Sequence, residues 1–208
     1  MKIIEPSVEL IGEVDGEKIM KHIELAGRVC YKSESRISDD SAEKFIANII
    51  KSGHESVIEH VSLTFKIICD RGVTHEIVRH RIASFSQEST RYCDYSNGKF
   101  DGELTFIKPN FWAEDDENFK IWRDTMKILE ENYLLMRKNG ARPQQARAIL
   151  PNSLKTEIFM TANLREWRHF LKLRTSSRAH PQMRQVALKI YEILKEKLPV
   201  IFSDIKAE

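Results

Sequence analysis

Two stretches of alternating apolar and polar residues constrain the fold of this chain more than any other feature. Between residues 61 and 69, apolar side chains occupy every second position. Successive side chains of a β-strand point to opposite faces of a sheet, so this alternation predicts a half-buried strand. A second alternation, from residue 154 to residue 161, predicts another strand, with a helix as the less favoured alternative. Any fold for this chain must therefore contain a sheet.

Helical periodicity accounts for much of the remaining sequence. Apolar residues recur at spacings of three and four between 119 and 136, which predicts a long amphipathic helix that ends at Asn139-Gly140. Asn163 is a good N-cap residue, and Glu166 stands at the capping-box position three residues later. Further helices are predicted at 19–30, 40–53 with Asp40 as its cap, 73–78, 143–147 and 181–198, and short strands at 3–14 and 104–107. Strands and helices together predict an α+β fold.

Length and composition favour one domain and exclude several classes of protein. With 208 residues and 41% hydrophobic content, the chain can bury a single sizeable core. The 33 Lys and Arg residues nearly balance 31 Asp and Glu residues, so the net charge of +2 gives no general case for binding nucleic acid or membranes. Three cysteines without a Cys-x-x-Cys spacing argue against a disulfide scaffold. No signal peptide or membrane span is evident, so we expect a cytoplasmic protein.

The basic character is instead local, and its densest point is the stretch Arg79–Arg91. Arg79, His80 and Arg81 are consecutive, and hydroxyl, amide and guanidinium donors follow up to Arg91. Arginine binds phosphate oxygens with two parallel hydrogen bonds, and hydroxyl groups fill the remaining acceptor positions. The composition therefore predicts an anion-binding cradle, with a solvated basic loop as the alternative.

A second basic region lies between Arg165 and Arg184. Six of its residues are Lys or Arg and one, Glu166, is acidic. Arg165 and His169 are four residues apart on the predicted helix, so they share one face of it. This region is the second candidate for binding an anion.

The histidines and cysteines could in principle serve two other chemistries, metal binding and nucleophilic catalysis. A zinc site on one helix face requires histidines at i and i+4, but Ile58 follows His54 and Arg79 follows His75 at that spacing. We therefore predict no metal site. Cys93 is the only cysteine near the first basic stretch, and we interpret it as a packing residue rather than a nucleophile.

The spacing of the basic residues resembles a known family. Arg-His-Arg at 79–81, then seven residues, Ser89 and Arg91 form the signature of the flavin-dependent thymidylate synthases. The segment His54–His60 and the residues Arg147, Asn163, Arg165 and Arg174 also match that family. The resemblance extends from about residue 54 to residue 174.

Membership of this family would imply a specific reaction. FAD would accept hydride from NADPH and pass it to dUMP, methylenetetrahydrofolate would supply the carbon, and dTMP would form without a cysteine nucleophile. The family assembles as homotetramers with active sites shared between subunits. For the single domain we expect a central, mostly antiparallel sheet flanked by long helices.

The resemblance also assigns residues. Arg174 would be the catalytic residue that polarises the uracil ring. The expected cofactor-binding residues are Ser56, Arg79, His80, Arg81, Gln87, Asn163, Arg165 and His169. The expected dUMP-binding residues are Glu76, Arg79, Gln87, Glu88, Ser89, Thr90, Arg91, Arg147 and Arg174. Two positions depart from the commonest members of the family. Glu76 stands where Gln is expected, and Thr90 stands where Gly or Gln is expected.

Two competing functions remain open from the sequence. The basic regions, together with Tyr92, Tyr95 and Trp167, suit a module that follows a nucleic-acid backbone and stacks bases. An inactive homologue kept for assembly is the other alternative. The thymidylate synthase hypothesis predicts no nucleic-acid partner and no membrane association.

Overall fold

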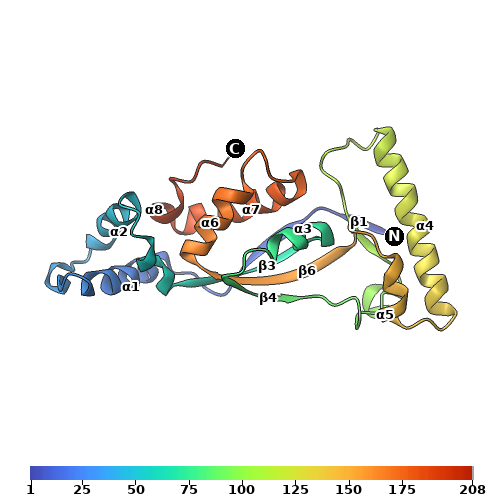
Figure 1. Ribbon diagram of the computed structural model, residues 1–208, viewed down its shortest axis with the longest axis horizontal. Helices are drawn as coiled ribbons and strands as arrows, with labels where there is room; N and C mark the ends of the chain where they lie inside the picture. Colours follow the sequence, from blue (N-terminus) through green and yellow to red (C-terminus); the bar gives the residue numbers. More distant parts are fainter. Residues whose placement is uncertain (208) are drawn as a thin grey trace. The chain divides into compact units, whose positions relative to one another are not determined.

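The computed structural model describes residues 1–207 (Figure 1). The strands are β1 (Lys2–Ile4), β2 (Ser7–Ile11), β3 (Ser62–Asp70), β4 (Ala83–Gln87), β5 (Thr105–Ile107) and β6 (Lys155–Asn163). The α-helices are α1 (Gly16–Val29), α2 (Ser41–Lys51), α3 (Arg71–Ile77), α4 (Glu117–Lys138), α5 (Pro143–Ala146), α6 (Leu164–Arg174), α7 (Pro181–Lys197) and α8 (Pro199–Phe202). Short 3-10 helices are η1 (Glu34–Arg36), η2 (Glu55–His60), η3 (Gly98–Phe100) and η4 (Arg147–Ile149). No helix within residues 1–207 has the length and apolar character needed to cross a bilayer.

Four strands form one mostly antiparallel sheet in the order β2-β3-β6-β4. The two long strands β3 and β6 are antiparallel, since Leu164 N donates to Val61 O at 3.0 Å and Arg71 N donates to Leu154 O at 3.1 Å. Between these points Thr64 Oγ1 lies 2.8 Å from Thr161 Oγ1. The short strands β1 and β5 form a separate parallel pair. The predicted α+β class and antiparallel sheet are therefore confirmed.

The residues group into two compact units. Unit 1 comprises Met1–Ser7, Ile67–Arg79 and Ser86–Ile158. Unit 2 comprises Val8–Lys66, His80–Phe85 and the chain from Phe159 onward. The strands β3 and β6 each contribute residues to both units, so neither unit is a contiguous segment of the sequence.

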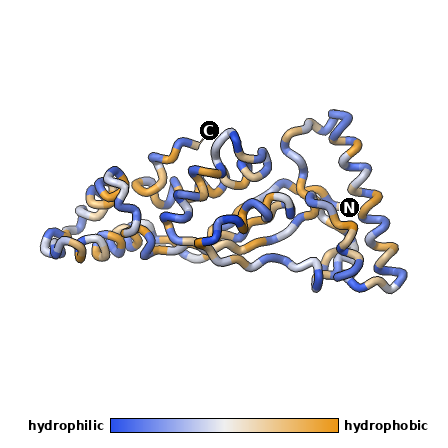
Figure 2. The backbone as a smooth tube through the Cα atoms, in the orientation of Figure 1, coloured by the Kyte–Doolittle hydropathy of each residue, from blue (hydrophilic) through white to orange (hydrophobic). Residues whose placement is uncertain are grey.

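The core of unit 1 is built around α4. Its buried members are Tyr95, Leu104, Phe106, Met126, Tyr133, Ala146 and Leu154. Apolar residues recur along α4 between hydrophilic ones, as Figure 2 shows. The buried Glu130 carboxylate on this helix accepts from the Leu104 backbone N–H at 2.8 Å and lies 3.0 Å from the Met1 amino group. The Glu130 carboxylate thus holds the Met1 amino group and the residue that precedes β5 against α4.

Unit 2 is mainly helical. α1 packs against α2, and α6 packs against both η2 and α7. The fully buried Trp167 of α6 lies edge-on to Phe65 with ring centroids 5.0 Å apart, and its indole N–H donates to the Leu63 carbonyl at 3.1 Å. Buried indole groups require such a partner. This packing attaches α6 to β3.

The structure differs from the sequence-based expectations at several places. The basic stretch Arg79–Arg91 contains a strand, β4, which the sequence analysis does not predict. α2 begins after Asp40 as expected, but the Asp40 side chain does not cap it and instead accepts from Ser38 Oγ at 2.9 Å. Finally, the short helix α8 follows α7 without having been predicted.

Candidate functional site

The helix α6 carries most of the second basic region, and Asn163 caps its start as the sequence predicts, whereas the Glu166 side chain does not complete the predicted capping box. The Asn163 side chain accepts from the Glu166 backbone N–H at 2.9 Å. Leu164, Trp167, Phe170 and Leu171 are buried. Because one face of α6 is used for packing, Arg165, His169 and Lys172 are exposed on the rest of its surface.

The two basic regions meet at His80. This residue begins the unit 2 part of the first basic stretch, and only 4% of its surface is exposed. Its Nδ1 lies 3.0 Å from Glu166 Oε1, and its Nε2 accepts from Arg174 Nε at 3.2 Å. The ring also packs on Phe170, with a centroid distance of 4.9 Å. Both ring nitrogens of His80 therefore have partners inside the chain.

A pocket of about 540 Å³ opens beside α6 within unit 2. Its lining residues are Glu55, Glu59, Ile82, Asn163, Arg165, Glu166, His169 and Lys172. This volume falls in the usual range for small-molecule sites, roughly 300–1,000 Å³. Cations, carboxylates and an imidazole all line it, so it can accept both phosphate oxygens and hydroxyl groups.

Ion pairs already hold the cations of this pocket. Arg165 Nη1 lies 2.6 Å from Glu59 Oε1, and Lys172 Nζ lies 3.4 Å from Glu55 Oε1. The Arg165 pair is solvent-exposed on both sides, and such pairs contribute little to stability. An anionic ligand can therefore replace Glu59 at Arg165 at small cost.

His80, Glu166 and His169 also place one potential metal-ligand atom each within 4.8 Å of one another. The arrangement does not suit a cation. The Arg174 guanidinium donates to His80, so a metal would meet a positive charge beside it and would have to displace one of the two hydrogen bonds of the ring. We interpret this cluster as a hydrogen-bonded network.

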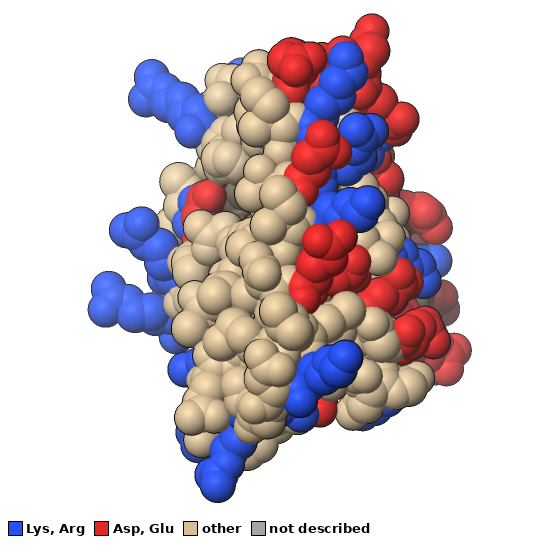
Figure 3. Space-filling model, turned by 90° about the vertical axis from the view of Figure 1, so that its right-hand side faces the viewer, with Lys and Arg blue, Asp and Glu red and all other residues tan. Residues whose placement is uncertain are grey.

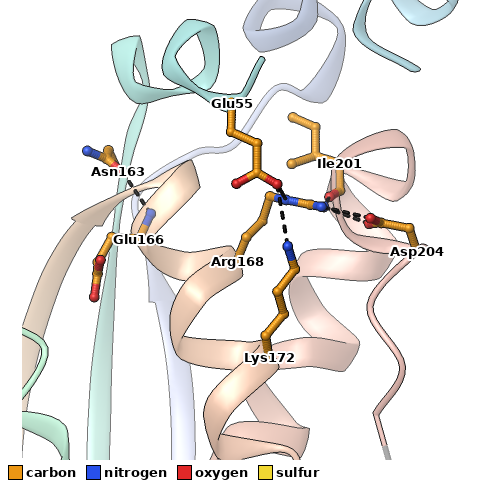
Figure 4. A network of polar contacts seen from close by, with 7 residues as sticks. All are labelled: Glu55, Asn163, Glu166, Arg168, Lys172, Ile201 and Asp204. Atoms are coloured by element: carbon orange, nitrogen blue, oxygen red, sulfur yellow. Dashed lines mark hydrogen bonds and ion pairs between the residues drawn. The ribbon is translucent and has the colours of Figure 1, made fainter. Parts of the chain in front are cut away.

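A buried arginine connects α6 to the predicted flavin-contacting segment (Figure 4). Arg168 Nε donates to Glu55 at 3.0 Å, and its two terminal nitrogens donate to the Asp204 carboxylate at 2.6 and 2.7 Å. Glu55 opens η2, whose next residue is the exposed Ser56. Arg168 thus holds the Glu55 side chain, which directly precedes Ser56. This structural role of Arg168 is not predicted from the sequence, where Arg168 is one of the six basic residues of the second region.

Unit 1 holds the second half of the Arg79–Arg91 stretch. A tight turn follows β4, because the Ser89 carbonyl accepts from the N–H groups of Tyr92 and Cys93 at 3.1 and 2.9 Å. Ser89 Oγ accepts from Arg91 N at 3.3 Å, and the Arg91 guanidinium lies 5.1 Å from the centre of the Tyr92 ring. The turn leaves the Arg91 side chain exposed to solvent.

Two predicted binding residues beside this turn have extensive internal contacts. The Gln87 amide donates to Thr74 Oγ1 at 3.0 Å and to Thr156 Oγ1 at 3.3 Å. The Glu88 carboxylate accepts from Tyr95 Oη at 2.6 Å and from Lys155 Nζ at 3.0 Å. Glu88 therefore anchors the end of β4, and burial together with this carboxylate raises the pKa of the Tyr95 phenol.

The predicted site residues divide between the units. Unit 2 holds Ser56, His80, Arg81, Asn163, Arg165, His169 and Arg174. Unit 1 holds Glu76, Arg79, Gln87, Glu88, Ser89, Thr90, Arg91 and Arg147. Apart from Arg79, Gln87 and Arg174, the predicted cofactor-binding residues thus lie in unit 2 and the predicted dUMP-binding residues in unit 1. The structure joins His80 directly to Arg174, and Glu166, which the sequence predicts only as a capping-box residue, completes that contact.

Together these features define an α+β protein in which basic side chains gather in two hydrogen-bonded regions. A model of the family described as thymidylate synthase complementing protein matches residues 10–200. The flavin-dependent thymidylate synthase of Corynebacterium efficiens is 34% identical over 222 aligned residues, which cover 98% of this chain and 86% of that protein. That of Pyrococcus furiosus is 39% identical over 167 residues, covering 80% of this chain and 68% of that protein.

This chain belongs to the family of flavin-dependent thymidylate synthases. The resemblance and the methyltransferase class predicted from the sequence are confirmed, and the nucleic-acid-binding alternative gains no support. Among solved structures, the UMP/dUMP methylase PolB from Streptomyces cacaoi, bound with 5-Br dUMP, aligns with a TM-score of 0.77. It is 23% identical, and the alignment covers 98% of this chain and 96% of that one, which supports the fold.

Proposed function

We propose that this chain methylates dUMP to dTMP, with methylenetetrahydrofolate as carbon donor and NADPH-reduced FAD as hydride donor. The observation that carries the proposal is the family match over residues 10–200, within which the signature arginines and Ser89 are all present. Relatives named flavin-dependent thymidylate synthase support the flavin, and the PolB complex with 5-Br dUMP supports a uridine monophosphate substrate.

Arg174 is the proposed catalytic residue. Methylation at C5 requires electron density at that carbon, and a cation beside N3 and O2 of uracil stabilises the ring after it loses a proton. A guanidinium keeps its charge at all relevant pH values and presents a planar edge, which suits this task. The hydrogen bond from Arg174 Nε to His80 orients the guanidinium plane.

The unit 2 pocket is the proposed site for part of the flavin dinucleotide. Arg165, Lys172 and His169 offer donors to pyrophosphate oxygens, while Glu55 and Glu59 offer acceptors to ribose hydroxyls. The donor set therefore fits the group. In the present arrangement His80 donates to Glu166, so its predicted contact with the pyrophosphate would require the ring to exchange partners. When bound, the flavin supplies a hydride that no amino-acid side chain can provide.

The turn in unit 1 is the proposed site for the dUMP phosphate. Ser89, Thr90 and Arg91 lie on this turn, and the exposed Arg147 opens η4. Hydroxyl groups and guanidinium forks bind phosphate oxygens well. Gln87 and Glu88 support the turn through their internal hydrogen bonds, which are required for a rigid binding surface.

Cys93 is not a convincing nucleophile. Covalent activation of uracil requires a thiolate. Burial raises the pKa of the Cys93 thiol, with the nearby Glu88 carboxylate as a further cause. The thiol form therefore dominates at neutral pH, which supports a mechanism without a covalent thiol adduct.

The test is a turnover assay on purified protein. We expect a flavin absorbance spectrum and dTMP formation that requires dUMP, methylenetetrahydrofolate and NADPH together. Arg174→Ala should retain bound flavin and lose about 100- to 1,000-fold in turnover, the usual loss when one charge-stabilising donor is removed. Unchanged turnover in this variant would exclude Arg174 from the mechanism, and wild-type protein without dTMP formation would refute the proposed function.

We also propose that the chain assembles as a homotetramer with shared active sites. On α4, the large hydrophobic side chains Ile121, Ile128 and Leu135 recur every seven residues and are 58%, 57% and 53% exposed. Figure 3 views the molecule from the α4 side and shows an uncharged surface bordered by a column of acidic and basic side chains. The first turn of α4 is acidic and its last turn basic, so two antiparallel copies would pair opposite charges.

Sedimentation analysis tests this assembly. Ile128→Glu should shift the tetramer toward smaller species, because it places a charge in the centre of the hydrophobic row. Lys127→Glu, an exposed neighbour outside that row, serves as the matched control and should leave the sedimentation profile unchanged. A wild-type protein that sediments as a fully active monomer would contradict the proposal.

A further inference from the structure

Three side chains of unit 2 form a continuous line of hydrogen bonds. Glu166 in the first turn of α6 lies 3.0 Å from His80 Nδ1, and Arg174 at the last residue of α6 donates through Nε to His80 Nε2 at 3.2 Å. His80 thereby bridges the two ends of one helix, about 12 Å apart at 1.5 Å per residue. His80 and Glu166 are 4% and 8% exposed. Buried hydrogen bonds of this kind fix side-chain orientation.

Only one protonation state of His80 satisfies both bonds. The Nε–H group of arginine is always a donor, so His80 Nε2 must be the acceptor and carry no proton. The neutral ring then carries its proton on Nδ1 and donates it to the Glu166 carboxylate. A doubly protonated ring would present an N–H group to Arg174, and the hydrogen bond between His80 and Arg174 would be lost.

The surroundings favour the neutral ring. Burial lowers the pKa of His80, and the Arg174 and His169 charges lower it further, whereas Glu166 raises it. Among residues 1–207, these three, all on α6, are the charged groups that shift this pKa, and the chain neighbours Arg79 and Arg81 are exposed. The negative charge of Glu166 is itself favoured at a helix N-terminus and the positive charge of Arg174 at a C-terminus.

We propose that Glu166 and His80 are positioning residues for Arg174: the carboxylate fixes the Nδ1–H tautomer of His80, and the unprotonated Nε2 then holds the guanidinium in its working orientation. This inference rests on the proposed function, in which Arg174 polarises the uracil ring. It gives Glu166 a role beyond the helix cap. It also gives His80 a role toward the substrate in addition to any contact with the flavin.

The first experiment observes the tautomer without any turnover. Nitrogen-15 spectra of histidine-labelled, flavin-loaded protein at pH 7.5 should contain one resonance pair of a neutral Nδ1–H imidazole that disappears in His80→Gln. In Glu166→Leu the same ring should lose its Nδ1–H tautomer. A wild-type His80 that is protonated on Nε2, or doubly protonated, would overturn the proposal even if the enzyme makes dTMP.

The second experiment uses turnover. His80→Phe keeps the ring packing on Phe170 but removes the acceptor, and we expect a kcat about 100-fold lower at unchanged flavin content, as for a misplacement of about 1 Å. His80→Gln restores an acceptor that does not titrate, so it should recover part of the rate and abolish the acid limb of the pH profile. His22→Gln, an exposed histidine on α1, is the matched control and should match the wild type.

Glu166→Gln separates positioning from mere packing. The amide oxygen can still accept from Nδ1–H, but the negative charge that favours imidazolium is lost, so the acid limb of kcat should move down by roughly one pH unit. An unmoved acid limb, or full kcat in His80→Phe, would overturn the proposal. Absence of dTMP in the wild type would instead refute the proposed function, and the nitrogen-15 result would still decide the tautomer.

Discussion

Replacing Arg168 by methionine should destabilise unit 2 more than any other single change to its charged residues. The Arg168 side chain is 2% exposed and donates to Glu55, to both carboxylate oxygens of Asp204 and to the Ile201 carbonyl (Figure 4). Methionine preserves most of the apolar stem but removes every donor. Three residues from two distant segments would then lose their hydrogen bonds to Arg168.

The magnitude follows from how exposed those acceptors are. Removal of one partner from a buried ion pair costs about 3–5 kcal/mol, because the other charge stays buried. The side chain of Asp204 is 49% exposed and that of Glu55 19%, so water can partly replace the arginine. We therefore expect a loss near the lower limit, about 3 kcal/mol. For a chain of this length that corresponds to a melting temperature lower by roughly 6–12 °C.

Urea unfolding followed by circular dichroism measures this loss. Arg165→Met is the matched control: Arg165 lies one helical turn earlier in a 2.6 Å ion pair with Glu59, but its side chain is 53% exposed, so we expect no measurable change. Arg168 holds the pKa of the Asp204 carboxyl below its usual value. Asp204→Asn should therefore cost stability above about pH 4, and the difference from wild type should vanish as the pH falls below that value. Equal urea midpoints for Arg168→Met and wild type would refute the reasoning.

Three further predictions concern other parts of the chain. Gly16→Ala should lower stability by about 1–3 kcal/mol despite the better helix propensity of alanine, because the new Cβ would lie 2.6 Å from the Lys197 carbonyl oxygen; thermal melting tests it. Asp94→Asn should cost roughly 1–2 kcal/mol at pH 7 and nothing in strong acid, since hydrogen bonds from Arg137 hold the pKa of Asp94 far below its usual value; urea midpoints measured across pH test it. Cys93→Ser should retain dTMP formation, and complete loss of turnover with intact folding would restore a nucleophilic thiol as a possibility.

Local patterns predicted the elements that bury one regular face. β3 and α4 match the predicted ranges closely because half of β3 and one stripe of α4 pack against a core. Such burial requires apolar residues at every second position of a strand and at every third or fourth position of a helix, and both patterns are visible in the sequence. β4 was not predicted because it has no regular apolar face. Its half-buried positions are Ala83, Phe85 and Gln87, and only one of these is a large hydrophobic residue. The Gln87 side chain is held by hydrogen bonds to two threonines. A hydropathy pattern cannot predict such polar contacts.

Contacts between distant segments account for what the sequence could not predict in the candidate site. Asn163 and Glu166 form a capping-box pattern, in which the Glu166 side chain would return to the backbone of Asn163. The folded chain keeps the Asn163 half of the box and directs the Glu166 carboxylate to His80, 86 positions earlier in the sequence. The Glu166 backbone N–H is satisfied in both cases, so the helix can begin in the same place while the carboxylate is used elsewhere. A single turn of helix can therefore serve as a cap and also orient a distant histidine, and only the packing of α6 decides which partner the side chain takes.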